Sequence, residues 1–181
     1  AGRGVLVVMN GEVHSARDVC KTGSLDVGAF ASPHGSLGRV VDGQTRWYRR
    51  TERPHTLDSE FEVSRVAELP LVGIVTSHGN MQPGVYGAWA DLGARAIVHA
   101  GFGGGIVPSY LLPSLAHLTE QGVLLVRCAR VPDALLVRNA TADDDAHGWV
   151  VADDQNPPRA RQQAPQAQTC TPETTQVQPN L

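Results

Sequence analysis

The sequence predicts a mixed α/β protein that contains a parallel sheet with flanking helices. Two observations from the second half of the chain predict this class. Short apolar runs of strand length recur there, and segments of helical length separate them. Buried strands that alternate with helices in this way are typical of parallel sheets. We expect the strands at residues 72–76, 96–100 and 123–127.

The first third of the chain predicts antiparallel β structure. An apolar run of strand length opens it, and Asn10-Gly11 follows, a pair that tolerates the positive φ of a tight turn. Asp42-Gly43 lies in the same way between two short extended segments and predicts a β-hairpin. The expected strands are residues 5–9, 12–19, 39–41 and 45–49, with a loop rich in glycine and serine over 20–36.

Glycines predict where the two helices of the second half end. Residues 84–92 are expected to form a helix that ends at Gly93, and residues 108–121 one that ends at Gly122, because glycine readily adopts the left-handed conformation found after helices. The glycine run 101–105 predicts a tight strand-to-helix turn. Its spacing is neither GxGxxG nor GxxxxGK[ST], which argues against nucleotide binding.

The composition changes near the C-terminus. The last residues are rich in proline and glutamine and hold almost no large apolar side chains, as is typical of disordered segments. The sequence therefore predicts a disordered, low-complexity tail over residues 156–181. Pro165 falls in this segment and would interrupt a helix.

Composition and charge exclude several function classes. The formal net charge of −3 gives no long-range attraction to nucleic acid or to an anionic membrane, so neither is expected as a partner. No apolar stretch reaches the roughly 18 residues that a transmembrane helix needs. The first residues do not have the pattern of a signal peptide either.

Neither the cysteines nor the histidines indicate a metal centre, and no cofactor is expected. Cys20, Cys128 and Cys170 are an odd number at wide spacing without a CxxC pair, so we interpret them as small core residues. The seven histidines show no spacing that is typical of a zinc site.

One basic residue differs from the others. Lys21 is the only lysine among the fifteen basic residues, and the rest are arginines. Such a lysine either occupies a position that needs a compact, titratable amine or has remained by chance.

Four segments of the chain resemble, in order, the later part of bacterial type II L-asparaginases and glutaminase-asparaginases. The likeness extends from Gly2 to Arg161, and the family's subunit has a long N-terminal portion without a counterpart in these residues. The segments are GVLVVMNGEVHSARDVCKT, WYRRTERPHTLDSEFEVS, AIVHAGFGGGIVP and RNATADDDAHGWVVADDQNPPRAR.

The resemblance implies two α/β domains of unequal size. Residues 1–53 correspond to the end of the larger N-terminal domain, 54–69 to a linker and 70–155 to the smaller C-terminal domain, with the low-complexity tail at 156–181. Family members form homotetramers, as dimers of dimers in which a neighbour's C-terminal domain completes each active site. Type II members are periplasmic or secreted, which implies the same compartment for this protein.

The resemblance also implies an amidohydrolase. Family members hydrolyse the side-chain amide of L-asparagine, and often that of L-glutamine, to the acid and ammonia. A threonine near the N-terminus attacks the amide, and the lysine of a DVTKT motif activates a second threonine. The motif reads DVCKT at residues 18–22 here, so the resemblance assigns the catalytic lysine to Lys21. A partly desolvated amine can lose its proton near neutral pH, whereas a guanidinium cannot.

Two substrate-binding positions of the family carry other residues in this chain. The family pattern HAGTGNGS has an asparagine where Gly104 stands, and RNAEVDDD has a glutamate where Thr141 stands. In the family this glutamate holds the substrate's α-ammonium, and a charge-assisted hydrogen bond of that kind contributes roughly 1.5–3 kcal/mol. Gly104 and Thr141 are kept as candidate substrate-binding positions, and the acidic run Asp143–Asp145 is interpreted as a solvated turn.

The family's TGGT and HGTDT segments, which carry the nucleophile, do not occur in these residues. The chain alone is therefore expected not to turn over asparagine, because loss of a nucleophile leaves only weak residual catalysis. The alternative is a non-catalytic α/β assembly or binding module that retains the family's oligomer interface. Gly104 and Thr141 favour this module, whereas the motif around Lys21 favours the enzyme.

Overall fold

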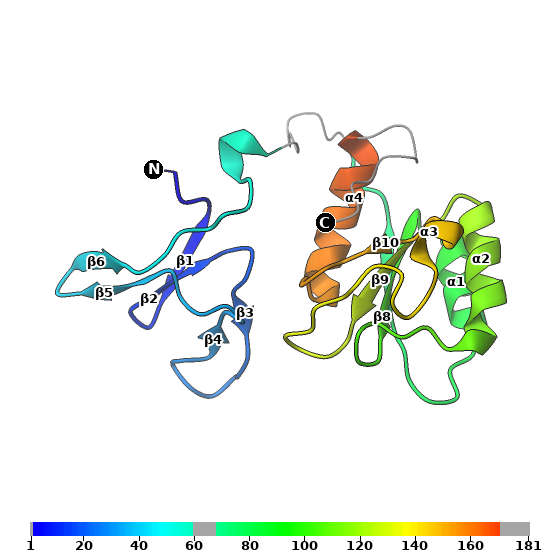
Figure 1. Cartoon of the computed structure of the whole chain (residues 1–181), viewed down its shortest axis with the longest axis horizontal. Coiled ribbons are helices and arrows are strands. Elements are labelled where there is room, and N and C mark those ends of the chain that lie inside the picture. Colours follow the sequence, from blue (N-terminus) through cyan, green and yellow to red (C-terminus); the bar gives the residue numbers. More distant parts are fainter. Residues whose placement is uncertain (1, 60–67, 171–181) are drawn as a thin grey trace. The chain divides into compact units, whose positions relative to one another are not determined.

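The computed structural model describes residues 2–59 and 68–170 of the chain. It divides into two compact units, Ala1–Glu60 and Phe61–Leu181 (Figure 1).

The first unit is built on a four-stranded antiparallel sheet. Its strands are β1 (Leu6–Met9), β2 (Glu12–Ser15), β5 (Gly38–Val41) and β6 (Gln44–Trp47), which lie in this order across the sheet. Both expected tight turns form. The φ values are 49° and 73° at Asn10-Gly11, and 51° and 74° at Asp42-Gly43, as such turns require. The turn predicted at Asn10-Gly11 and the β-hairpin predicted at Asp42-Gly43 are thereby confirmed.

The extended segment expected over residues 12–19 is shorter in the structure. It ends at Ser15, whose carbonyl accepts hydrogen bonds from the amides of Asp18 and Val19 and so closes a turn. Two short strands, β3 (Cys20–Lys21) and β4 (Phe30–Ala31), then pair within the stretch that was predicted to be a loop. A single turn of 3₁₀ helix, η1 (Thr56–Asp58), follows near the end of the unit.

The second unit contains the predicted parallel sheet. Its four strands lie in the order β10, β9, β8, β7, and every neighbouring pair is parallel. The strands expected from the apolar runs are confirmed within one or two residues of their predicted ends. These three strands are β7 (Val72–Thr76), β8 (Ala96–Gly101) and β9 (Leu124–Ala129). The fourth strand, β10 (Val150–Val151), was not predicted.

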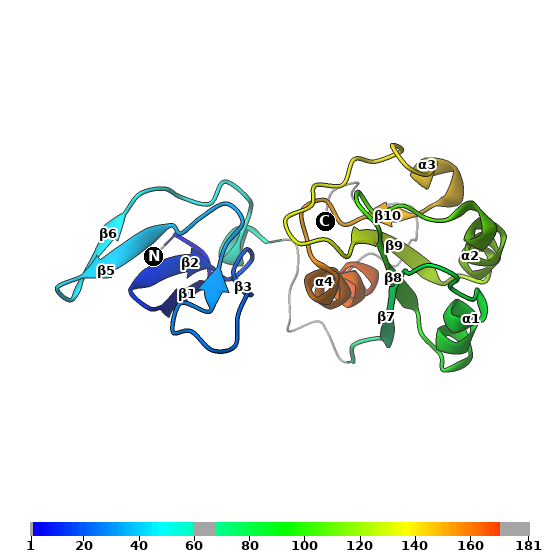
Figure 2. The ribbon, with the colours of Figure 1, turned by 90° about the horizontal axis from the view of Figure 1, so that it is seen from below.

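Helices cover both faces of this sheet. Helices α1 and α2 lie on one face and α4 lies on the other (Figure 2). Gly93 and Gly122 follow α1 and α2 with φ values of 87° and 84°, which confirms the predicted helix ends. The bounds are α1 (Gly84–Asp91), η3 (Ser109–Leu111), α2 (Leu112–Glu120), α3 (Asp144–His147) and α4 (Pro157–Cys170).

Alternating strand residues form two core layers. Ala96 and Val98 of β8 face the cluster that includes α4, whereas Ile97 between them faces the cluster under α1 and α2. Cys128 lies in the first layer, where burial raises the pKa of its thiol to about 12. Its interpretation as a small core residue is confirmed.

Helix α4 differs from the sequence prediction. Residues 157–170 form a helix, although a disordered tail was expected from residue 156. Ala160 and Ala164 are fully buried against the sheet. Because their side chains are single methyl groups, the helix can approach the sheet closely. Tertiary packing thus stabilises a helix that holds almost no large apolar side chains, and it tolerates the buried Pro165 inside the helix. The remainder of the predicted tail, residues 171–181, lies outside the described residues.

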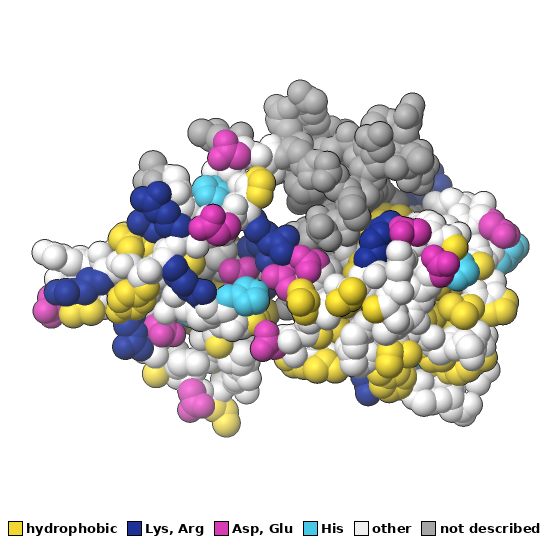
Figure 3. Space-filling view, viewed as in Figure 1, with side chains coloured by type: hydrophobic (Ala, Val, Ile, Leu, Met, Phe, Trp, Pro, Cys, Tyr) yellow, Lys and Arg dark blue, Asp and Glu magenta, His cyan; other side chains and the backbone are white. Residues whose placement is uncertain are grey.

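Both units expose charged and large apolar side chains (Figure 3). Positive and negative side chains both occur on the first unit, and apolar side chains gather on parts of the second (Figure 3). Leu135 and Val137 of the second unit are 68% and 61% exposed. Within the described residues, no helix is long and apolar enough to cross a membrane.

The packing of α4 predicts the effect of enlarging its buried face. Replacing Ala164 with leucine is expected to lower the free energy of unfolding by about 1–3 kcal/mol, because a fully buried methyl group leaves no room for three more carbons. The same leucine at exposed Gln162 is the matched control and is expected to change it by less than about 0.5 kcal/mol. Urea denaturation of both variants tests this, and equal effects would contradict the packing described here.

Candidate functional site

Lys21 lies on β3 in the first unit. Its backbone pairs with Phe30 of β4, and its side chain is exposed. In the same motif, Asp18 accepts a hydrogen bond from Arg17 at 3.2 Å, and the Thr22 amide donates to the Ala29 carbonyl at 2.7 Å. The DVCKT motif is thus a turn followed by a short strand that presents the lysine to solvent. Among residues 2–59 and 68–170, no carboxylate forms an ion pair with Lys21.

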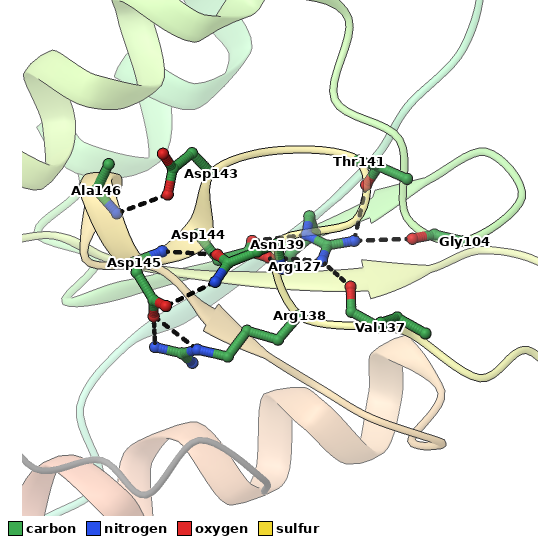
Figure 4. Close-up of polar contacts among 10 residues, drawn as sticks. All are labelled: Gly104, Arg127, Val137, Arg138, Asn139, Thr141, Asp143, Asp144, Asp145 and Ala146. Atoms are coloured by element: carbon green, nitrogen blue, oxygen red, sulfur yellow. Dashed lines mark hydrogen bonds and ion pairs between the residues drawn. The ribbon is translucent and has the colours of Figure 1, made fainter.

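The second unit contains a buried arginine that sequence analysis did not identify. Arg127 lies on β9 and is fully buried, as is Asp144 at the start of α3. Arg127 Nε and Nη2 donate to the two carboxylate oxygens of Asp144, each at 2.7 Å (Figure 4). This is the bidentate geometry in which a planar guanidinium binds a carboxylate most strongly.

The other N–H groups of Arg127 bind two neighbouring segments. Nη1 donates to the Gly104 carbonyl at 2.8 Å and to the Thr141 hydroxyl at 2.9 Å, and Nη2 donates to the Val137 carbonyl at 2.8 Å. All five N–H groups of the guanidinium therefore have an acceptor. The two candidate substrate-binding positions, Gly104 and Thr141, are brought together by this one side chain, whereas Lys21 belongs to the other unit (Figure 4).

The acidic run does not form the solvated turn that the sequence predicted. Asp144 is buried in its ion pair with Arg127 and also accepts the Asn139 amide at 2.7 Å. Asp143 caps α3 by accepting the Ala146 amide at 3.1 Å. Hydrogen bonds from Asn139 and Arg138 lower the pKa of exposed Asp145. The prediction of a solvated turn is wrong for Asp144, because a buried arginine requires a buried counter-charge.

One signal in the sequence could have revealed this pair. Arg127 directly follows Val123–Val126 and precedes Cys128, so it is a charged residue inside an apolar strand. A charge at such a position needs a carboxylate partner. The sequence cannot say which of the aspartates supplies it.

Close packing explains why two positions of the glycine run, 101 and 105, are glycines. A Cβ on Gly105, whose φ is +79°, would lie 2.7 Å from Leu136 Cδ2 and 3.2 Å from Arg127 Nη1. A Cβ on Gly101 would lie 2.5 Å from the Ile106 carbonyl oxygen. Position 104 is different, because a Cβ there would meet no atom within 4 Å. The first and last glycines of the run are therefore required by packing, and Gly104 is not.

A buried histidine holds the far end of the glycine loop. His99 Nε2 lies 3.1 Å from the Ile106 carbonyl, and His99 Nδ1 lies 2.6 Å from the hydroxyl of Tyr86. A carbonyl only accepts, so Nε2 carries the proton, and Nδ1 accepts from the tyrosine. Burial lowers the pKa of His99, the hydrogen bond to Ile106 opposes this, and the charge of Arg127 lowers the pKa further. The neutral imidazole is therefore the form that fits the site.

The chemistry available around Arg127 depends on how the polar groups there are already paired. The charge of Arg127 is neutralised by Asp144, and the Thr141 hydroxyl accepts a hydrogen bond from within the chain. Gly104 and Thr141 thus offer a backbone loop and a hydroxyl, without a free charge. In the part of the chain that the structure describes, no three His, Cys, Asp or Glu side chains are grouped so that they could hold a metal ion.

Family models match both parts of the chain. The model for the glutaminase/asparaginase C-terminal domain matches residues 71–179, and the model for the N-terminal part of asparaginase matches residues 1–53.

Individual proteins are similar over almost the whole chain. The glutaminase-asparaginase of Pseudomonas aeruginosa is 42% identical over 98% of this chain and 49% of its own length. L-asparaginase 2 of Escherichia coli K12 is 39% identical over 98% of this chain and 51% of its own length. The probable periplasmic L-asparaginase of Haemophilus influenzae is 39% identical over 89% of this chain and 46% of its own length. The chain thus spans about half the length of these curated relatives.

The glycine loop offers a matched pair of substitutions. Gly105→Ala is expected to lower the free energy of unfolding by about 2 kcal/mol or more, because the methyl group would clash with Leu136 and the positive φ disfavours alanine. Gly104→Ala is expected to change it by less than about 0.5 kcal/mol, since the space there is open. Thermal unfolding of the two variants compares them. Similar losses would contradict the packing described for Gly105.

His99 predicts a dependence of stability on pH. Its pKa is lowered in the folded state, so below about pH 6.5 the unfolded state binds the proton first and stability falls as the pH falls. His99→Gln keeps a donor for Ile106 and an acceptor for Tyr86 but does not titrate. Between pH 7.5 and 5, the wild type is expected to lose stability more steeply than this variant, by up to about 1.4 kcal/mol per pH unit. Urea denaturation gives the free energy of unfolding at each pH. If it falls equally with pH in the wild type and in the variant, His99 does not contribute to the pH dependence of stability.

Proposed function

Because the chain belongs to the glutaminase/asparaginase family, we propose that it is part of an amidohydrolase that acts on the side-chain amide of L-asparagine or L-glutamine. The observation that carries this proposal is a similarity of 39–42% identity to named glutaminase-asparaginases and L-asparaginases over 98% of the chain. It extends through both units, so it is not confined to a shared fold core. The products would be L-aspartate or L-glutamate and ammonia.

Lys21 is the proposed catalytic residue of this chain. Its amine would take the proton from a threonine hydroxyl, as the lysine of the DVTKT motif does in the family. The exposure of Lys21 within the first unit supports this role, because its ammonium is not committed to a carboxylate of the described residues.

The 181 residues are not proposed to act alone. They contain neither TGGT nor HGTDT, so the attacking threonine would have to come from another segment. By resemblance, residues 1–53 form the end of the nucleophile-bearing domain, 54–69 a linker and 70–155 the body of the smaller domain. A homotetramer and a periplasmic location are proposed on the same ground; the relative from H. influenzae is itself named periplasmic.

A non-catalytic assembly module is the second candidate. The observation that favours it is the state of the two substrate-binding positions: Gly104 has no side chain, and the hydroxyl of Thr141 is bonded to Arg127. Neither can provide the charge with which the family's glutamate binds an α-ammonium. This chain would then retain the fold and the subunit interface without turnover.

An ammonia-release assay separates the two candidates. The purified chain is expected to release no ammonia from L-asparagine or L-glutamine. Mixed with a separately produced N-terminal half of the P. aeruginosa glutaminase-asparaginase, it is expected to show activity, and Lys21→Ala is expected to lower that activity by about 100-fold or more. Lys21→Arg is expected to lower the activity by the same factor, because a guanidinium stays protonated.

The control variant is Arg46→Ala, which removes an exposed cation from β6 in the same unit. It is expected to leave the activity of the mixture unchanged. Ammonia release by the chain alone would refute the proposed need for a second segment. A mixture that is inactive, although size-exclusion chromatography shows that the two polypeptides associate, would favour the assembly module.

A further inference from the structure

We propose that Arg127 is a positioning residue that holds two loops in one fixed arrangement: the glycine loop, residues 101–106, and the acidic segment, residues 137–144. The inference rests on the proposed function only where it concerns substrate, because Gly104 and Thr141 lie in these two segments. The positioning itself is a property of the fold.

The geometry of the guanidinium supports this role. Its two N–H groups on one edge bind both oxygens of Asp144, and the remaining three bind Gly104, Val137 and Thr141, all at 2.7–2.9 Å (Figure 4). The group is planar and rigid, so acceptors bound to it keep fixed positions relative to one another. Arg127 itself is fixed by its place inside β9, between buried neighbours in the strand.

Other hydrogen bonds hold each loop separately: His99 donates to the Ile106 carbonyl in the glycine loop, and Asn139 exchanges two hydrogen bonds with Asp145 beside the acidic segment. Within the glycine loop, the amides of Gly105 and Ile106 both donate to the Phe102 carbonyl, which closes the turn locally but does not tie it to the acidic segment. Within the acidic segment, the Ala140 amide donates to Val137 at 3.4 Å, and the Asn139 amide donates to Asp144. Within the described residues, the hydrogen bonds that join the two segments to one another are those of Arg127.

Charge alone does not explain the choice of arginine. A lysine could pair with Asp144, but its ammonium has three donors on a single atom and cannot reach acceptors on opposite sides at once. Arg127→Lys therefore keeps the buried ion pair and removes the connection between the loops. This separates positioning from a purely electrostatic contribution to folding.

Amide hydrogen exchange, followed by NMR in the full chain, tests the positioning. In Arg127→Lys, the amides of Gly105, Ile106, Asn139 and Ala140 are expected to exchange about 10-fold faster or more, because local opening of both loops becomes easier. The amides of Ile97 and Val98 in β8 are expected to keep their rates.

Two results would overturn the inference. One is an unchanged rate in either loop. The other is an equal acceleration of the loops and of β8, which would mean that Arg127 only contributes to global stability. Arg138→Lys is the matched control: Arg138 also binds a carboxylate, that of Asp145, and its replacement is expected to leave Gly105 and Ile106 unaffected.

A second variant decides the question if Arg127→Lys does not fold. Thr141→Val removes one acceptor at an exposed residue and preserves the shape of the side chain. It is expected to accelerate exchange at Asn139 and Ala140 by about 3-fold or more, since one of the bonds to Arg127 is lost. Rates identical to those of the wild type would overturn the inference.

The active mixture described above provides the functional readout. Arg127→Lys is expected to raise KM for L-asparagine about 10-fold and to change kcat by less than about 3-fold, because the loops would bind substrate and would not perform the chemical step. A loss confined to kcat would overturn the positioning of substrate loops. If the wild-type mixture releases no ammonia, the proposed function fails, while the exchange rates still decide whether Arg127 holds the loops.

Discussion

The buried ion pair between Arg127 and Asp144 is the interaction on which the loop end of the parallel sheet depends. Both side chains are fully buried, so neither can exchange its partner for water. Removing one member of such a pair costs about 3–5 kcal/mol, because the other charge remains buried without compensation. The pair is acceptable here because every N–H of the guanidinium and both carboxylate oxygens are engaged.

Several features of the second unit follow from this requirement. The close approach of Arg127 and Leu136 leaves no space for a side chain at position 105, so a glycine is required there. The same cation lies beside His99 on the neighbouring strand and contributes to keeping that imidazole neutral. The neutral imidazole in turn donates to the Ile106 carbonyl. Charge burial, glycine placement and histidine protonation are therefore parts of one arrangement.

The candidate functional residues are divided between the two units. Lys21 is the exposed residue of a short strand, whereas Gly104 and Thr141 are held by the buried arginine. By resemblance, both sets of residues correspond to functional positions of the glutaminase/asparaginase family to which the chain belongs. The chain spans about half the length of its relatives. An exposed amine and two uncharged positions do not by themselves form a hydrolytic centre. Under the proposed function, another segment would supply the nucleophile and the charge that binds substrate.

The sequence by itself determined the features that depend on neighbouring residues in the chain. The turns at Asn10-Gly11 and Asp42-Gly43, the apolar strands of the parallel sheet and the helix ends at Gly93 and Gly122 were all predictable, because local backbone preferences and short-range periodicity decide them. Only the tertiary structure decided the rest. Ala160 and Ala164 form a helix because the sheet lies against them, and Asp144 is buried because Arg127, seventeen positions away, needs its charge. Such contacts depend on which segments meet in space, and the residues next to each other in the chain do not determine this.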